Sequence, residues 1–261
     1  MAEGRFDANW FLRQYGVTTR EDIQLEAWVY DNGIDIIEAD LEGASAQLIR
    51  LGDITQIVLS SRLNELGARR FAIAHELFHF LKNHPSLSPT MMCQPKWLRS
   101  GTKELHAYEL GSNAFGSALL LPEFLLRKRC EVSPVSLDVP WQLTKEYDVS
   151  LLASARRFVE LSSERCAAVF AKEGVVQWST YSSTFSRKIP AGRKLRRDSI
   201  AWDFHATGKL DERAQPVPAR AWLSTSSNED IIEHATCRPD YGTVLSLLWV
   251  PDDVGARVGM P

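Results

Sequence analysis

Apolar positions follow a helical period through much of the first 165 residues and a strand-like alternation from about residue 166 onward. Helices are predicted at residues 8–15 and 21–32, with Gly33 closing the second. Thr18, Thr19 or Asp22 is available as the N-cap of the second helix. Three runs rich in Ile, Val and Leu then predict strands, at residues 34–39, 46–51 and 54–60.

The segment from 52 to 83 should contain a tight turn and then a buried helix. Gly52-Asp53 predicts a hairpin between the second and third strands. Residues 69–83 are apolar nearly all round, so they predict a helix inside the protein. Residues 85–102, rich in Pro and Ser, predict a loop.

The buried helix contains the sequence His75-Glu76-Leu77-Phe78-His79. Two histidines four residues apart lie on one helix face, where a single tetrahedral zinc can bind both ring nitrogens. Glu76, beside the first ligand, would reach a water at the metal and act as general base, as in the H-E-x-x-H zinc peptidases. The alternative is a pair of core histidines bonded to backbone groups, which is a rare coincidence in a chain with six histidines.

A zinc peptidase needs a third protein ligand and leaves the fourth position to water. The extended motif H-E-x-x-H-x-x-G-x-x-H is excluded, because Lys82 and Pro85 stand at its glycine and histidine positions. A second helix predicted at residues 104–121 offers Glu109, with Asn113 one turn further on the same face to orient a ligand. Its competitors are Glu104, His106 and Glu123.

The two helices together resemble the ImmA/IrrE family of metallo-endopeptidases. That family combines an H-E-x-x-H helix with a later helix of the form E-x-x-x-N-x-F-A-x-x-L-L-x-P. The matching residues here are Glu109, Asn113, Phe115, Leu119, Leu120 and Pro122. The resemblance covers residues near 30–165 and implies zinc bound by His75, His79 and Glu109, with Glu76 as the catalyst. Mn²⁺ or another divalent cation is the alternative metal.

The resemblance also implies a protein substrate, a helix-turn-helix transcriptional repressor cleaved under stress or in a mobile element. His106 or Tyr108 is the expected oxyanion donor. Gly111 and Gly116 depart from the family pattern, which has an acidic residue and Ala at these positions. Each glycine destabilises a helix by about 1 kcal/mol, so these two either permit close helix packing or weaken the site.

Residues 136–165 resemble a helix-turn-helix, with helices predicted at 141–147 and 150–161. A DNA-binding role would use a small set of polar and basic side chains: Ser150, Ser154, Arg156 and Arg157. We favour the alternative that the two helices only pack, because the basic content of the segment is modest.

From Cys166 onward the alternation predicts a separate α+β domain. Strands are expected at 167–172 and 175–181, joined by a turn at Glu173-Gly174, and at 200–205, 219–224 and 243–250. Residues 227–235 predict a helix or an acidic loop. Comparison of this region with a GAF sensor domain is an analogy of fold alone. A basic cluster within it could contact nucleic acid or an acidic partner, although a solvated loop is the favoured interpretation: Arg187, Lys188, Arg193, Lys194, Arg196 and Arg197.

The composition indicates a globular protein but does not favour any class of ligand or partner. The chain of 261 residues is 44% hydrophobic and 24% charged, which is typical of globular proteins, and its net charge of −3 favours no ligand class. Its four cysteines form no C-x-x-C pair and are expected to be thiols. We expect a cytoplasmic protein without membrane contact, because no signal peptide and no run of 18 apolar residues is evident.

The expected fold is therefore α+β in three parts. Residues 1–135 form a zinc metallopeptidase domain with a small sheet, 136–165 a helix-turn-helix-like segment, and 166–261 a regulatory or docking domain. One alternative is a catalytically weak or inactive peptidase fold that binds a regulator or DNA. A structural zinc protein is another, but no fourth protein ligand is evident.

Overall fold

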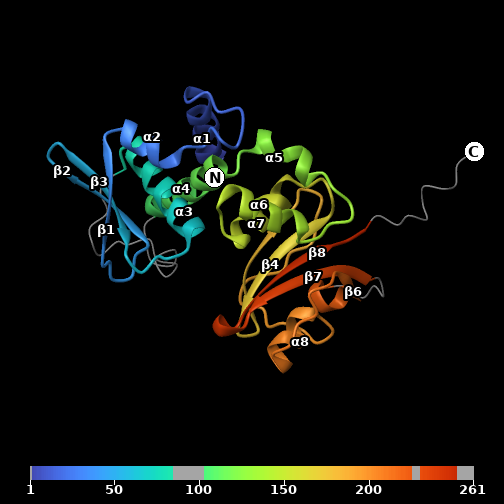
Figure 1. Cartoon of the computed structure of the whole chain (residues 1–261). Coiled ribbons are helices and arrows are strands. Elements are labelled where there is room, and N and C mark those ends of the chain that lie inside the picture. The colour runs from blue at the N-terminus through green and yellow to red at the C-terminus, as the bar shows by residue number, and fades with distance from the viewer. Residues whose placement is uncertain (1, 85–102, 225–229, 252–261) are drawn as a thin grey trace, which may run out of the picture. The chain divides into compact units, whose positions relative to one another are not determined.

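The computed structural model describes residues 2–84, 103–224 and 230–251. Its mixed helices and strands confirm the α+β class, with one sheet of three strands and one of five (Figure 1). The chain divides into two compact units, Met1–Leu125 with Leu143–Ser150 and Leu126–Gln142 with Leu151–Pro261. Among the described helices, none has the length and apolar character needed to cross a membrane.

The first unit contains helices around a small sheet. Its elements are α1 (Ala2–Gln14), α2 (Leu25–Asp31), β1 (Ile34–Ala39), β2 (Ala46–Leu51), β3 (Ile54–Ser60), α3 (Leu66–Leu81) and α4 (Lys103–Leu120). The strand order is β1-β3-β2, with β1 parallel and β2 antiparallel to β3. The predicted hairpin is confirmed, since Leu51 lies opposite Ile54 and Gly52 adopts a φ of 59°. Strand β2 lies at one edge of this sheet, and helix α3 contacts both β2 and β3.

The second helix begins later than predicted. The Asp22 carboxylate accepts hydrogen bonds from the backbone N–H groups of Thr18 and Thr19, at 2.9 and 2.8 Å. These bonds stabilise a turn, because a short polar side chain competes with helix formation for the same backbone groups. Helix α2 therefore starts at Leu25 and not at residue 21.

Helix α4 lies against both α1 and α3. A Cβ atom added at Gly111 would lie 3.1 Å from the ring of Phe78, and one added at Gly116 would lie 3.3 Å from the ring of Phe71. The contact with α1 is closer still, because a Cβ at Gly4 would lie 2.2 Å from the carbonyl oxygen of Gly111. Gly111 and Gly116 therefore permit the close packing of α3 on α4, and Gly4 permits that of α1 on α4.

The second unit is built around a five-stranded antiparallel sheet. The elements from residue 123 onward are α5 (Glu123–Cys130), α6 (Asp138–Tyr147), α7 (Leu151–Leu161), β4 (Cys166–Lys172), β5 (Val175–Tyr181), α8 (Ile200–Thr207), β6 (Gln215–Pro218), α9 (Ala219–Trp222), β7 (Asp230–Arg238) and β8 (Thr243–Trp249). The strand order is β5-β4-β8-β7-β6. Helix α7 contacts β4 and β5, and α8 contacts β7 and β8. Helix α5 and strand β6 were not predicted.

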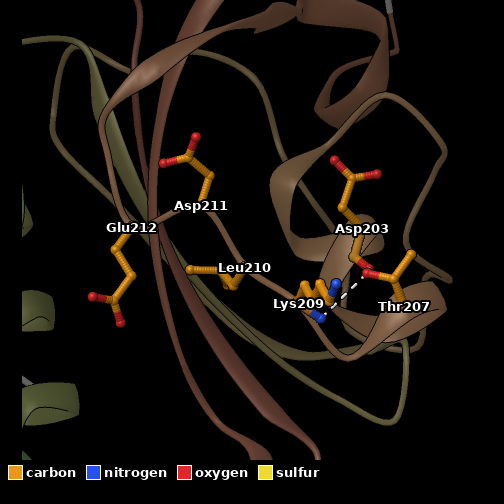
Figure 2. A pocket seen from close by; sticks show the side chains of 6 residues that line it. All are labelled: Asp203, Thr207, Lys209, Leu210, Asp211 and Glu212. Atoms are coloured by element: carbon orange, nitrogen blue, oxygen red, sulfur yellow. Dashed lines mark hydrogen bonds between the residues drawn. The ribbon is translucent and has the colours of Figure 1, made fainter.

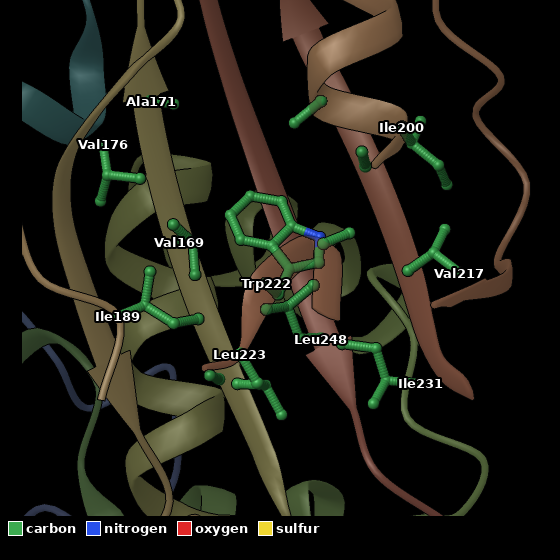
Figure 3. Close-up of a cluster of buried hydrophobic side chains, with 14 of the residues drawn as sticks. Val169, Ala171, Val176, Ile189, Ile200, Val217, Trp222, Leu223, Ile231 and Leu248 are labelled. Atoms are coloured by element: carbon green, nitrogen blue, oxygen red, sulfur yellow. The ribbon is translucent and has the colours of Figure 1, made fainter. Parts of the chain in front are cut away.

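The hydrophobic core of this unit gathers around Trp222, which is 2% exposed (Figure 3). Val169 from β4, Val217 from β6 and Leu248 from β8 belong to the same cluster. Alternate residues of β4 enter it, while the intervening Ala168 is also fully buried. Strand β4 is thus covered on both faces, which explains its nearly continuous apolar sequence.

Three predictions for this region are wrong. Residues 200–205 form helix α8 instead of a strand, because the Ser199 side chain caps it by accepting from the N–H of Trp202 and Gly208 ends it at a φ of 73°. Residues 219–224 were predicted as a strand, but Ala219–Trp222 is the short helix α9. Of residues 227–235, those from Asp230 onward belong to strand β7.

The error at β7 has a clear cause, a buried carboxylate. Glu233 is fully buried and accepts four hydrogen bonds of 2.8–3.1 Å, so an acidic side chain occupies a core position of the strand. The donors are the N–H groups of Ile200 and Ala201, Nε1 of Trp222 and Oγ of Ser246. Glu233 therefore connects α8, α9 and β8 to β7.

Candidate metal centre

The two histidines of α3 point their Nε2 atoms toward each other. His75 and His79 are each 5% exposed, and their Nε2 atoms lie 3.1 Å apart. Their spacing of four residues places both rings on the face of α3 that meets α4.

Glu109 on α4 completes a group of three. Its Oε2 lies 3.3 Å from Nε2 of His75, and its Oε1 lies 3.5 Å from Nε2 of His79. Three ligand atoms of a tetrahedral zinc, each at 2.0–2.1 Å from the ion, should be about 3.3 Å from one another. The observed separations of 3.1, 3.3 and 3.5 Å match this requirement. Among the residues that the structure describes, this is the group with metal-ligand geometry.

The charge of Glu109 also suits a divalent cation. Burial alone would raise the pKa of Glu109, but hydrogen bonds and charge interactions with His75 and His79 outweigh it and hold the pKa below its ordinary value. The site thus presents a carboxylate and two imidazoles, a donor set that binds zinc and related divalent metals.

Each histidine also has a partner on its outer nitrogen. Oδ1 of Asn113 lies 3.2 Å from Nδ1 of His75, and Nδ1 of His84 lies 3.0 Å from Nδ1 of His79. Such contacts fix which ring nitrogen carries the proton and hold the ring in place. Asn113 was named from the sequence as an orienting residue, whereas His84 was missed.

The fully buried Ser112 is a second residue that sequence reasoning missed. Its Oγ lies 3.0 Å from Nε2 of His79 and donates to the carbonyl oxygen of Tyr108. Its position directly before Asn113, and one turn after Tyr108, gave a signal that could have found it. Ser112 places an additional oxygen beside the ligand group.

Glu76 follows His75 directly in α3 and is not a member of the candidate ligand group. It is 5% exposed, and its Oε2 accepts a 3.1 Å hydrogen bond from the backbone N–H of Leu48. The edge strand β2 therefore orients the carboxylate that the motif assigns as general base.

The other candidates on α4 and α5 are placed as follows. Tyr108 stacks on His84, with ring centroids 4.0 Å apart, so it lies beside the pair of His79 and His84. The side chains of Glu104 and His106 lie outside the described residues. Glu123 is on α5 and is not part of the metal-ligand group.

The basic residues predicted to contact DNA are used within the second unit. The Arg157 side chain is 2% exposed, and its guanidinium nitrogen lies 3.3 Å from the carboxylate of Glu160. The guanidinium of Arg156 lies 4.3 Å from the ring centroid of Trp178. Ser154 is fully buried and donates to the carbonyl of Leu151.

The later basic cluster contacts the end of α9. Arg193 donates to the carbonyls of Ala221 and Trp222, and Arg196 donates to that of Arg220 at 2.9 Å. Cations suit the carbonyl-rich end of a helix, so these arginines have a structural role. The remaining members differ in their surroundings: Arg187 donates to the carbonyl of Ser224, Lys188 lies over Tyr181, Arg197 lies over Trp202, and Lys194 is exposed.

A surface hollow lies in the second unit (Figure 2). It is lined by Asp203, Thr207, Lys209, Leu210, Asp211 and Glu212. Asp211 already forms hydrogen bonds of 2.8 and 3.0 Å with Arg213, and the N–H of Lys209 donates to Thr207. None of these lining residues belongs to the described group with metal-ligand spacing, which lies on α3 and α4 and is the candidate site.

Comparison with known proteins points to the same helices. A family model described as the IrrE N-terminal-like domain, a peptidase family, matches residues 30–159 and therefore includes all of His75, Glu76, His79 and Glu109. A solved structure described as a Mycobacterium tuberculosis transcriptional regulator superposes with a TM-score of 0.59, over 100% of this chain and 94% of that chain. The two sequences are 16% identical, so this likeness concerns the fold. No curated protein matches the chain.

Proposed function

Since the chain is a member of the ImmA/IrrE family through its IrrE N-terminal-like domain, we propose that it is a zinc-dependent endopeptidase. The observation that carries this proposal is the convergence of His75, His79 and Glu109 at the separations expected around one tetrahedral zinc. Zinc bound there would act as a Lewis acid on the scissile carbonyl and would lower the pKa of the attacking water to about 7.

The protein's own groups would carry out the proton transfers. The Glu76 carboxylate, buried beside the ligands, takes a proton from the attacking water and passes it to the leaving amine. Its hydrogen bond with the N–H of Leu48 holds the carboxylate in one orientation. Tyr108 and His106 on α4 are the candidate donors to the developing oxyanion.

The edge strand β2 gives a route for binding the substrate. An extended peptide can add to an exposed strand edge through backbone hydrogen bonds. Because Leu48 of β2 contacts Glu76 directly, a peptide laid along this edge would pass close to the general base. We propose that the scissile bond is brought to the centre in this way.

We further propose that the substrate is a helix-turn-helix transcriptional repressor, cleaved in the cytoplasm during a stress or mobile-element response. This proposal rests on the family resemblance. Residues 166–261 would serve as a regulatory or docking domain, and their five antiparallel strands support the comparison with a GAF domain. DNA contact through Arg156 and Arg157 is not favoured, because both side chains are engaged within the unit.

Co-expression with candidate repressors tests the function. The wild-type protein should contain about one zinc per chain and generate discrete repressor fragments, whereas Glu109→Ala should lose both properties. A wild-type protein without zinc, or a Glu109→Ala variant that still cleaves, would refute the proposal.

A regulatory module built on an inactive peptidase fold is the second candidate function. The observation that favours it is the structural neighbour, which is described as a transcriptional regulator. Such a module would bind its partner without cutting it. Intact repressor that co-purifies with the zinc-loaded wild-type protein would support this candidate over the endopeptidase.

A further inference from the structure

The end of helix α3 folds back onto one of the proposed zinc ligands. Asn83 adopts a φ of 48°, in the left-handed region that Asn tolerates better than most residues. The N–H of Asn83 donates to the carbonyl of Phe80 at 2.9 Å, and the N–H of His84 donates to that of His79 at 3.0 Å. These two bonds define a Schellman motif, which brings the second residue after the helix beside the third from its end.

In this protein the two residues that the motif brings together are both histidines. Nδ1 of His84 lies 3.0 Å from Nδ1 of His79, and the ring centroids are 5.1 Å apart. On its other side His84 stacks on Tyr108 of α4, at 4.0 Å and an interplanar angle of 25°. The His84 ring is therefore held between α3 and α4.

Arg50 on β2 stabilises this arrangement from the sheet. Its guanidinium donates to the carbonyl of His84 at 3.1 Å and to Oδ1 of Asn83 at 3.0 Å. It also donates to the carbonyls of Phe80 and His79 at 3.2 and 3.4 Å. A single side chain thus fixes the turn that places His84.

The tautomer of a metal-bound histidine determines which of the two rings donates the hydrogen bond between His79 and His84. A neutral histidine that binds a metal through Nε2 carries its proton on Nδ1. His79 turns its Nε2 toward His75 and Glu109, so its Nδ1–H must donate to Nδ1 of His84. His84 then accepts at Nδ1 and carries its own proton on Nε2.

We propose that His84 is a positioning residue that fixes the tautomer and ring orientation of the zinc ligand His79. The proposal rests on the metal centre assigned above and extends it by one residue. It requires an acceptor at the position of Nδ1, whereas a merely structural role would require an aromatic ring between His79 and Tyr108.

Two substitutions separate these roles. His84→Phe keeps a ring to stack on Tyr108 and removes the acceptor. His84→Asn loses the ring but keeps an oxygen where Nδ1 stood. Zinc affinity of each purified full-length variant is measured by competition with a chromophoric chelator, and thermal unfolding of the metal-free proteins shows whether each is folded.

We expect His84→Phe to bind zinc about 10- to 100-fold more weakly than wild type, as is typical when a partner of a metal-bound histidine is lost. His84→Asn should bind zinc close to the wild-type affinity. Wild-type affinity in His84→Phe, or a larger loss in a folded His84→Asn variant than in His84→Phe, would overturn the proposal. A wild-type protein that binds no zinc would overturn the metal centre itself, and zinc binding without cleavage would overturn only the endopeptidase.

Discussion

The backbone N–H of Leu48 donates a 3.1 Å hydrogen bond to Oε2 of Glu76, which joins the edge strand β2 to the carboxylate of the H-E-x-x-H motif. Two residues further along the same strand, Arg50 donates to carbonyls in the last turn of α3. Helix α3 is therefore attached to the sheet both at Glu76, the proposed general base, and at its end. Strand β2 is part of the site although it contributes no ligand.

Arg50→Met should destabilise the first unit, because four acceptors at the end of α3 each lose the hydrogen bond from Arg50 while the aliphatic part of the side chain is retained. We expect the free energy of unfolding to fall by about 1–3 kcal/mol in urea denaturation. Arg62→Met is the matched control, since Arg62 forms one exposed ion pair with Asp40 that should contribute less than about 1 kcal/mol. Equal losses in the two variants would show that Arg50 has no special role.

Gly4→Ala should separate α1 from α4. The added methyl would lie 2.2 Å from the carbonyl oxygen of Gly111, so backbone must move, and we expect a loss of about 1–3 kcal/mol in thermal or urea unfolding. Gly111→Ala is the control, because its methyl meets only the end of the Phe78 ring at 3.1 Å and both changes gain helix propensity. A smaller loss of unfolding free energy in Gly4→Ala than in Gly111→Ala would contradict the close contact of α1 with α4.

Glu233→Gln should destabilise the second unit strongly. All four partners of the carboxylate are donors, so the amide NH₂ of Gln would face N–H or O–H groups in a fully buried site. Each donor left facing the NH₂ group should lower the free energy of unfolding by about 1–3 kcal/mol, measured by urea denaturation followed through Trp fluorescence. Ser246→Ala removes one donor and should lose about 1 kcal/mol. A Gln variant as stable as Ser246→Ala would contradict this account of the buried carboxylate.

Glu109→Ala should lower zinc occupancy, because it removes one of the three proposed ligands. Metal analysis of the purified protein should give well under one zinc per chain, while circular dichroism stays helical. Glu123→Ala is the control on the neighbouring helix α5, and its zinc content should equal that of wild type. Unchanged zinc in Glu109→Ala would move the third ligand to another residue.

The sequence predicts those features that depend on short-range periodicity. Strands β1, β2 and β3 have the predicted bounds, and α3 carries the two histidines because their spacing of four is a property of the helix itself. On α4, spacing left Glu109 as one candidate beside Glu104, His106 and Glu123, and the resemblance to the ImmA/IrrE family selected it together with Asn113. The strand bounds and the spacing of the two histidines could be predicted without knowing which elements meet in space.

The features that sequence reasoning missed depend on contacts between distant segments. His84 becomes a partner of His79 only through the turn at Asn83 and the support of Arg50. Residues 200–205 form a helix because Ser199 caps it and Glu233, 33 residues beyond Ile200, accepts its first N–H groups. A local alternation of apolar residues contains none of this information.

The proposed role of Glu76 as the base of a zinc endopeptidase is tested by Glu76→Gln. Zinc-loaded wild type and zinc-loaded Glu76→Gln are incubated with a peptide library, and new peptide N-termini are identified by mass spectrometry. We predict equal zinc content in the two proteins, because Glu76 is not in the ligand group, and cleavage by the wild type alone. Cleavage by Glu76→Gln at a rate near that of wild type would show that Glu76 is not the base. No cleavage by a wild-type protein with full zinc would show that the protein is not an endopeptidase.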